Sequence, residues 1–225
     1  MFKKEIGMRS GITVGLFVLM AAISVSAQES FSRANSWDFY IGPQYVTGET
    51  LHFDGGARAE IEDMASLLFG FGYHPNRALS FDFMFSSASA NYVGVARSDA
   101  GEERRFTSNM YSSSFSIGTT YYLLPGRFTP YLSALIGYTY TDSGVENGDY
   151  YENCWWDPWY GYYCRPYADT YSSTDFSYGG AFGLRYDFPS HFFLKASVGM
   201  TDINLNTTGS STFTYYNLLA GFSFE

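Results

Sequence analysis

The two cysteines of this sequence, Cys154 and Cys164, offer its most definite chemistry, because the chain contains no others. Their thiols can join as a disulfide or bind a metal ion. No histidine lies within twenty residues of the pair, and two thiolates do not complete the four ligands of a structural zinc site. We therefore predict an intramolecular disulfide and no metal site. Such a bond persists only in an oxidising compartment.

The nine residues between the cysteines are dominated by aromatic side chains. Six of them are Trp155, Trp156, Trp159, Tyr160, Tyr162 and Tyr163. Exposed aromatic clusters often form binding surfaces, so one interpretation is a contact surface for sugars or for proteins of a host. The other interpretation is a hairpin that packs on itself, with Tyr-rich flanks and a tip closed by the disulfide. A third use is an aromatic girdle at the level of the lipopolysaccharide, and the sequence leaves all three open.

Charged residues recur at alternate positions in otherwise apolar segments. On one face of these segments lie Asp38, Glu60, Glu62, Asp82, Arg185, Asp187 and Lys195. If that face is enclosed, its charges should pair, because an unpaired buried charge is costly. We expect Arg185 and Lys195 to neutralise carboxylates among Asp38, Glu62 and Asp82. Such a network either plugs an interior or lines a path for ions.

The sequence predicts no catalytic residue and no cofactor. Its histidines, His52, His74 and His191, fall in a polar stretch and two expected turns, and none belongs to a His-x-Ser motif. The net charge of −9 does not favour nucleic-acid binding, which needs cations to neutralise phosphates.

Alternation with a period of two predicts the elements that position these residues. In LSFDFMFS, for example, Phe81 and Phe83 oppose Asp82 and Met84. Strands are expected at about 37–47, 59–73, 78–90, 107–124, 128–142, 174–188, 192–205 and 212–224. Residues 57–65 also fit a helical stripe, so a short helix remains an alternative there.

The faces and the connections of these strands predict a membrane barrel. Large apolar side chains crowd one face, and small or polar residues occupy the other, as in a transmembrane β-barrel that is apolar outside. Three tight turns, near residues 75, 126 and 190, alternate with longer stretches at 48–58, 91–106, 143–173 and 206–211. The predicted fold is all-β: an eight-stranded antiparallel up-and-down transmembrane β-barrel with long extracellular loops.

The N-terminus predicts export. Residues 1–27 combine a basic head, an apolar run of about fifteen residues and small residues before Ala27, as in a secretory signal peptide. The run is shorter than the ~20 residues of a spanning helix. We expect a short periplasmic segment at 28–36 and a barrel domain at 37–225.

Three local motifs resemble one known family. They are Gly70-Phe71-Gly72-Tyr73 before a tight turn, Pro130-Tyr131-Leu132 followed by Gly137-Tyr138, and a last strand with Tyr216, Leu218, Ala220, Phe222 and Phe224 on one face. With them the chain resembles the small outer-membrane β-barrels of the OmpA-barrel, OmpX and Ail type. The resemblance implies the bacterial outer membrane, contact with its lipid and lipopolysaccharide, and insertion by the barrel-assembly machinery. That machinery reads a terminal aromatic residue, whereas here Glu225 follows Phe224.

The resemblance leaves the function open between two classes. One is surface interaction or adhesion, or a role in envelope stability, through the aromatic extracellular loops. The alternative is a narrow, porin-like passive channel for ions or small solutes.

Overall fold

The computed structural model describes residues 32–52, 58–97, 103–157, 159, 161–205 and 209–225. Within them the strands are β1 (Ser36–Val46), β2 (Thr50–His52), β3 (Arg58–Ile61), β4 (Met64–His74), β5 (Leu79–Arg97), β6 (Glu103–Tyr122), β7 (Phe128–Asp157), β8 (Gly161–Asp187), β9 (Phe192–Leu205) and β10 (Gly209–Phe224). No helix of this part of the chain is long and apolar enough to cross a membrane. The expected signal peptide, residues 1–27, lies outside the described residues.

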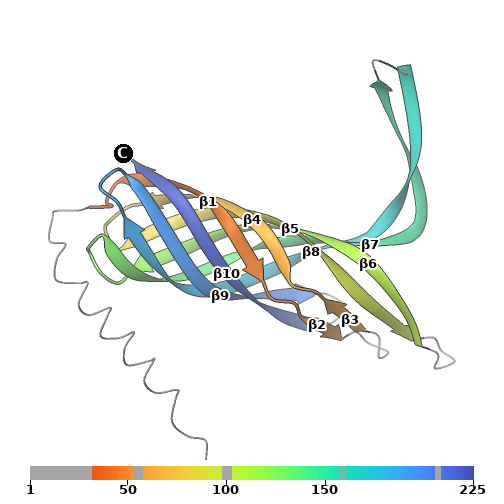
Figure 1. Ribbon diagram of the computed structural model, residues 1–225, viewed down its shortest axis with the longest axis horizontal. Helices are drawn as coiled ribbons and strands as arrows, with labels where there is room; N and C mark the ends of the chain where they lie inside the picture. The colour runs from red at the N-terminus through yellow and green to blue at the C-terminus, as the bar shows by residue number, and fades with distance from the viewer. Residues whose placement is uncertain (1–31, 53–57, 98–102, 158, 160, 206–208) are drawn as a thin grey trace, which may run out of the picture.

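Eight of these strands close into a ring (Figure 1). β1 pairs with β4 on one side and with β10 on the other, and the strands from β4 to β10 each pair with the next. All pairings are antiparallel. The short strands β2 and β3 pair with each other, and β3 adds to β5 beyond the point where β4 begins. The ring confirms the predicted eight-stranded up-and-down barrel.

The two ends of the barrel differ. The turn end holds three short connections, after β4, β6 and β8, together with the start of β1 and the end of β10. At the opposite, loop end, the hairpins β5–β6 and β7–β8 continue beyond the ring (Figure 1). These unequal connections match the predicted alternation of tight turns and long loops.

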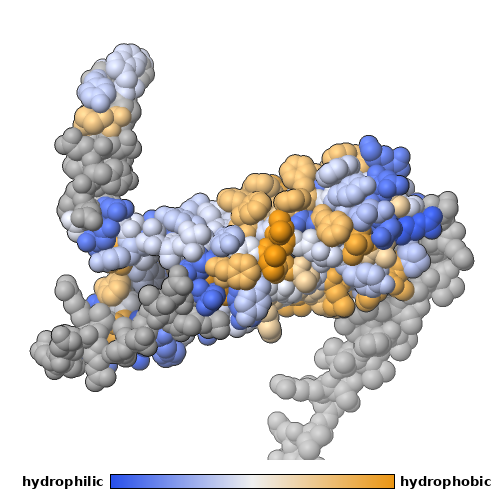
Figure 2. Space-filling model, turned by 180° about the vertical axis from the view of Figure 1, so that it is seen from behind, coloured by the Kyte–Doolittle hydropathy of each residue, from blue (hydrophilic) through white to orange (hydrophobic). Residues whose placement is uncertain are grey.

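Alternate residues along each strand face opposite sides of the barrel wall. Phe81 and Phe83 of β5 are exposed on the outside, as is Phe182 of β8, whereas Asp82 and Arg185 are buried within the barrel. Figure 2 shows hydrophobic side chains gathered around the barrel, with hydrophilic ones toward its ends on the visible face. The apolar outer surface is the one that suits lipid.

Two predictions about residues 57–65 are corrected. The alternative of a short helix is wrong, because β3 covers Arg58–Ile61 and β4 begins at Met64. The assignment of Glu60 and Glu62 to the interior is also wrong, because both side chains are exposed while Ala59 and Ile61 are buried. Residues 62–63 lie between β3 and β4. The buried positions are therefore odd-numbered in β3, at Ala59 and Ile61, and even-numbered in β4, at Met64 and Leu68.

Asp63 secures this break at the loop end. Its carboxylate accepts hydrogen bonds from the backbone N–H of Gly48, at 2.7 Å, and from the hydroxyl of Tyr45. The Gly48 bond and then the Tyr45 bond lower the pKa of Asp63 from its ordinary value. The break is therefore held by specific contacts to the end of β1 and to the connection between β1 and β2.

The stretch 143–173, expected as a loop with paired flanks, is an extension of β7 and β8. Its register shifts between Asp142 and Glu146 and again between Glu146 and Tyr150. Gly144 and Gly148 lie in these two irregular stretches with φ of 61° and 91°, a conformation that glycine adopts without steric cost. In Figure 1 the hairpin bends away from the barrel beyond this region.

Candidate functional site

The turn-end half of the lumen holds a cluster of ion pairs centred on Arg185. This fully buried guanidinium contacts Asp38 through both terminal nitrogens and donates from Nε to Oδ1 of Asp187 at 2.8 Å. It also donates to the hydroxyls of Tyr122, at 3.2 Å, and Ser223, at 3.1 Å. Charge-assisted bonds of this kind are the strong ones, so Arg185 links β1, β6, β8 and β10 across the lumen.

Lys195 and Asp82 form a second pair in the same enclosed space. The ammonium lies 3.8 Å from the carboxylate and 4.4 Å from the centre of the Tyr40 ring. Asp82 also accepts hydrogen bonds from the hydroxyls of Ser80, Thr120 and Tyr40 at 2.8 to 3.1 Å. The carboxylate therefore accepts hydrogen bonds from β1, from β6 and from its own strand β5, and it faces the ammonium on β9.

Two members of the cluster were not among the predicted site residues. His74, expected in a turn, is fully buried at the end of β4, and its Nε2 lies 2.8 Å from Oδ2 of Asp38. Extending the alternation of β4 from Leu68 through Gly70 and Gly72 would have placed it inside. Arg33 precedes β1, where no alternation exists to extend.

Arg33 closes the lumen at the turn end. It donates from Nε and Nη2 to Oδ2 of Asp187, at 2.9 and 2.6 Å, and from Nη2 to the Gly126 carbonyl at 2.7 Å. The resulting network joins Asp38 and Asp187 to Arg33 and Arg185, and the Lys195–Asp82 pair lies beside it in the lumen. Of the residues predicted for it, the exposed Glu62 takes no part.

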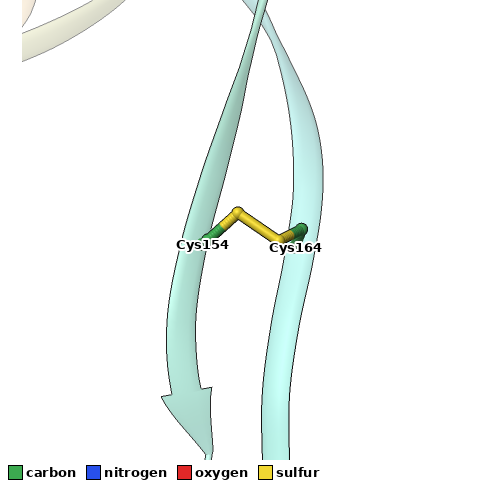
Figure 3. Close-up of a disulfide and its surroundings, with 2 residues drawn as sticks. All are labelled: Cys154 and Cys164. Carbon is green, nitrogen blue, oxygen red and sulfur yellow. A yellow bond between two sulfur atoms is a disulfide. The ribbon is translucent and has the colours of Figure 1, made fainter.

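The other predicted site lies on the extension of β7 and β8. Cys154 and Cys164 are directly opposite in the register and form a disulfide, with their Cα atoms 4.1 Å apart (Figure 3). The bond joins the two strands of the hairpin close to its tip, as the spacing of the cysteines predicts.

Aromatic side chains are exposed around this disulfide. The exposed fractions are 69% for Trp156, 88% for Trp159 and 74% for Tyr162. Trp156 and Tyr162 are cross-strand partners, one step from the pair formed by Trp155 and Tyr163. The side chains of Trp155 and Tyr163, and the whole of Tyr160, lie outside the described structure. Three of the six predicted surface aromatics are thus placed in solvent.

A family comparison covers the whole ring. The family model described as "Outer membrane protein beta-barrel domain" matches residues 15–225. The chain belongs to this outer-membrane β-barrel family. Its place is therefore the outer membrane, as predicted, and its apolar outer face is the lipid-facing surface. In such barrels the short turns lie at the periplasmic side and the long loops outside.

Among solved structures, OprG supports this assignment at the level of the fold, and two weaker similarities accompany it. OprG of Pseudomonas aeruginosa is 14% identical over 85% of this chain and 97% of its own, with a TM-score of 0.55. Ail of Yersinia pestis is 12% identical over 85% and 99%, with a TM-score of 0.49. The neisserial surface protein A is 15% identical over 82% and 95%, with a TM-score of 0.47. A comparison of the chain with curated proteins found no match.

Proposed function

We propose that this outer-membrane barrel is a surface-binding protein whose contact element is the tip of the β7–β8 hairpin. The observation that carries the proposal is the exposure of Trp156, Trp159 and Tyr162 around a disulfide on a segment beyond the ring. Aromatic rings give large contact area at low entropy cost and dominate many interfaces. Their natural ligands are the apolar faces of sugars and apolar patches on proteins of a host or another surface.

The hairpin is suited to binding because its tip is constrained. A cross-link between facing strands limits the conformations of the nine residues that it encloses, so less ordering is required when a ligand binds. Such a constraint serves the presentation of side chains, since the ring of strands that spans the membrane closes without it. The proposal assigns no catalytic step to the chain.

The lumen network supports a surface role over the alternative of a passive channel. An eight-stranded barrel is just wide enough for side chains to fill. Here two buried ion pairs, Arg185 with Asp38 and Lys195 with Asp82, occupy its turn-end half. Because these paired charges occupy the lumen and neutralise one another, they favour a plug that blocks the passage of ions. Insertion by the barrel-assembly machinery and contact with lipopolysaccharide complete the proposed setting.

Attachment of cells that display the protein tests the proposal. The variant with Trp156→Ala, Trp159→Ala and Tyr162→Ala should bind immobilised glycans and matrix proteins at least ten-fold less than the unmutated protein. The matched control is Tyr171→Ala, an exposed aromatic nearer the barrel on the same hairpin, which should bind normally. Attachment that survives the triple substitution would refute the binding role. If the same variant instead made cells sensitive to detergent, the hairpin would serve envelope stability.

A further inference from the structure

The cavity in the loop-end half of the lumen has no charged side chain in its lining, unlike the turn-end half, and part of its wall is apolar. The buried cluster of this half consists of Leu51, Ala59, Ile61, Met64, Ala90, Tyr92, Met110 and Phe213. Interiors of outer-membrane barrels are generally polar, so this lining departs from the pattern of the fold. Neither the ion pairs nor the hairpin accounts for it.

This apolar region forms part of the wall of a partly open cavity of about 140 Å³. The rest of the wall carries uncharged hydroxyl and amide groups, most of them from serine and threonine. Leu68 and Met84 line it, and both belong to a second buried cluster with Tyr40 and Phe193. That cluster forms the floor, since Tyr40 and Phe193 in turn contact the ammonium of Lys195. A layer of apolar and aromatic side chains thus separates the cavity from the ion pairs beneath it.

The lining specifies the chemistry of an occupant. All of its residues lie in the described structure, and none of them is Asp, Glu, Lys, Arg or His. Three are methionines, Met64, Met84 and Met110, whose flexible, polarisable side chains adapt to differently shaped partners. A carboxylate or an ammonium ion would find no counter-ion here, whereas an uncharged molecule would lose little on entry.

One polar atom of the lining lacks a partner. Among the described residues, Oδ1 of Asn217 is buried and accepts no hydrogen bond, and Asn217 lines the cavity. Buried acceptors are normally satisfied, so an exception calls for an explanation. A ligand with one hydroxyl group would supply the missing donor while its apolar part filled the remaining volume.

We propose that this cavity binds a small, uncharged, largely apolar molecule that carries one hydrogen-bond donor. The volume sets the scale of the ligand, because a cavity of ~150 Å³ is large enough for a molecule such as benzene. Benzyl alcohol has the proposed chemistry, toluene lacks the hydroxyl group, and benzoate carries a charge. The three compounds are therefore matched probes of the site.

Methyl NMR of the refolded, ¹³C-methionine-labelled protein in detergent micelles tests the proposal. Met64, Met84 and Met110 line the cavity, whereas Met200 is exposed on the outside of β9 and reports partitioning into the micelle. Benzyl alcohol should shift the three interior methyl signals with saturation, and Met200 should show no saturable change. Benzoate should give no saturable shift. Proportional, unsaturable shifts at all four methyls, or saturable binding of benzoate, would overturn the proposal.

Two adjacent substitutions locate the site. Ala88→Phe fills the cavity from β5, and Ser87→Phe places the same ring on the outer face, where Ser87 contacts Tyr111. The first should weaken benzyl alcohol binding at least ten-fold, and the second should leave it unchanged. Ser112→Phe, the cross-strand partner of Ala88, replaces the first variant if that protein fails to refold. Unchanged affinity in a refolded filling variant would overturn the location.

Asn217→Leu tests the assigned polar contact. The unmutated protein should bind benzyl alcohol several-fold more tightly than toluene, because only the alcohol donates a hydrogen bond to Oδ1. In Asn217→Leu this preference should disappear while toluene still binds. A preference that persists in the variant would refute the role of Asn217.

Discussion

At the scale of single residues, Arg185 carries the most connections of any charged group described in the lumen. Its guanidinium contacts two carboxylates, Asp38 and Asp187, and two hydroxyls, and it is fully buried. The five N–H groups of arginine are arranged for several acceptors at once. A lysine could not replace it, because a single ammonium cannot reach acceptors on four strands.

Arg185→Met should destabilise the barrel strongly. The substitution keeps much of the side-chain volume but leaves Asp38 and Asp187 without their shared cation, which typically costs about 3–5 kcal/mol. Urea unfolding of the protein in lipid vesicles, followed by tryptophan fluorescence, measures this loss. Arg77→Met is the matched control, since Arg77 is exposed and contacts Ser32 in the described structure. Equal unfolding midpoints for the two variants would contradict the central role of Arg185.

At the scale of elements, alternation in the sequence predicts the membrane strands well because one face of each is uniformly apolar. In β5, the alternation of Phe81 and Phe83 with Asp82 predicts both that a strand forms and which of its faces is turned toward lipid. The same reasoning fails where the alternation is interrupted. Residues 62–63 reverse the parity of β3 relative to β4, and nothing in the local composition marks this shift. The side of the barrel wall that a residue faces therefore depends on whether the strand is continuous, as well as on the residue type.

Site residues that lie within strands could be predicted from the alternation of the sequence, and those outside strands could not. Asp38, Asp82, Arg185 and Lys195 lie on alternating positions and were found by parity. Arg33 was not, because it precedes β1 and enters the lumen only through the closed three-dimensional ring. Likewise, the apolar cavity depends on residues from many strands meeting in space, and a single strand shows no sign of it.

The β7–β8 extension and the barrel should respond independently to loss of the disulfide. Cys154→Ser with Cys164→Ser removes a cross-link near the hairpin tip. The barrel part of the β7–β8 pairing, from Phe128 opposite Tyr186 to Asp142 opposite Ser172, and the other seven ring pairings lie elsewhere. Closing a ring this short contributes roughly 2–3 kcal/mol to local order. Heat-modifiable mobility on gels should therefore be unchanged, while proteolysis of the hairpin should become faster. Loss of the heat-modifiable form would show that the barrel needs the bond.

At the scale of the whole molecule, the barrel has three zones along its axis. The turn end is closed by ion pairs, the cavity above them is lined by uncharged and partly apolar side chains, and the β7–β8 hairpin projects beyond the ring (Figure 1). Outside, hydrophobic side chains face lipid (Figure 2). An ion crossing such a barrel would meet a segment whose lining offers no counter-ion, and then a group of ion pairs whose charges already neutralise one another. Both zones oppose conduction, for different reasons.

Removal of a matched ion pair tests whether the charged zone is the plug. Asp82→Ala with Lys195→Ala deletes both partners, so it avoids leaving one buried charge unpaired. The two truncated side chains leave space, and the hydroxyls of Ser80 and Thr120 lose Asp82 as their acceptor. Both changes favour entry of water into the lumen. In planar bilayers the unmutated protein should show no long-lived open state, and the double variant should open several-fold more often. Phe83→Ala, on the lipid face of the same strand, should not change conductance. Stable, wide openings of the unmutated barrel would show that the ion pairs do not close it.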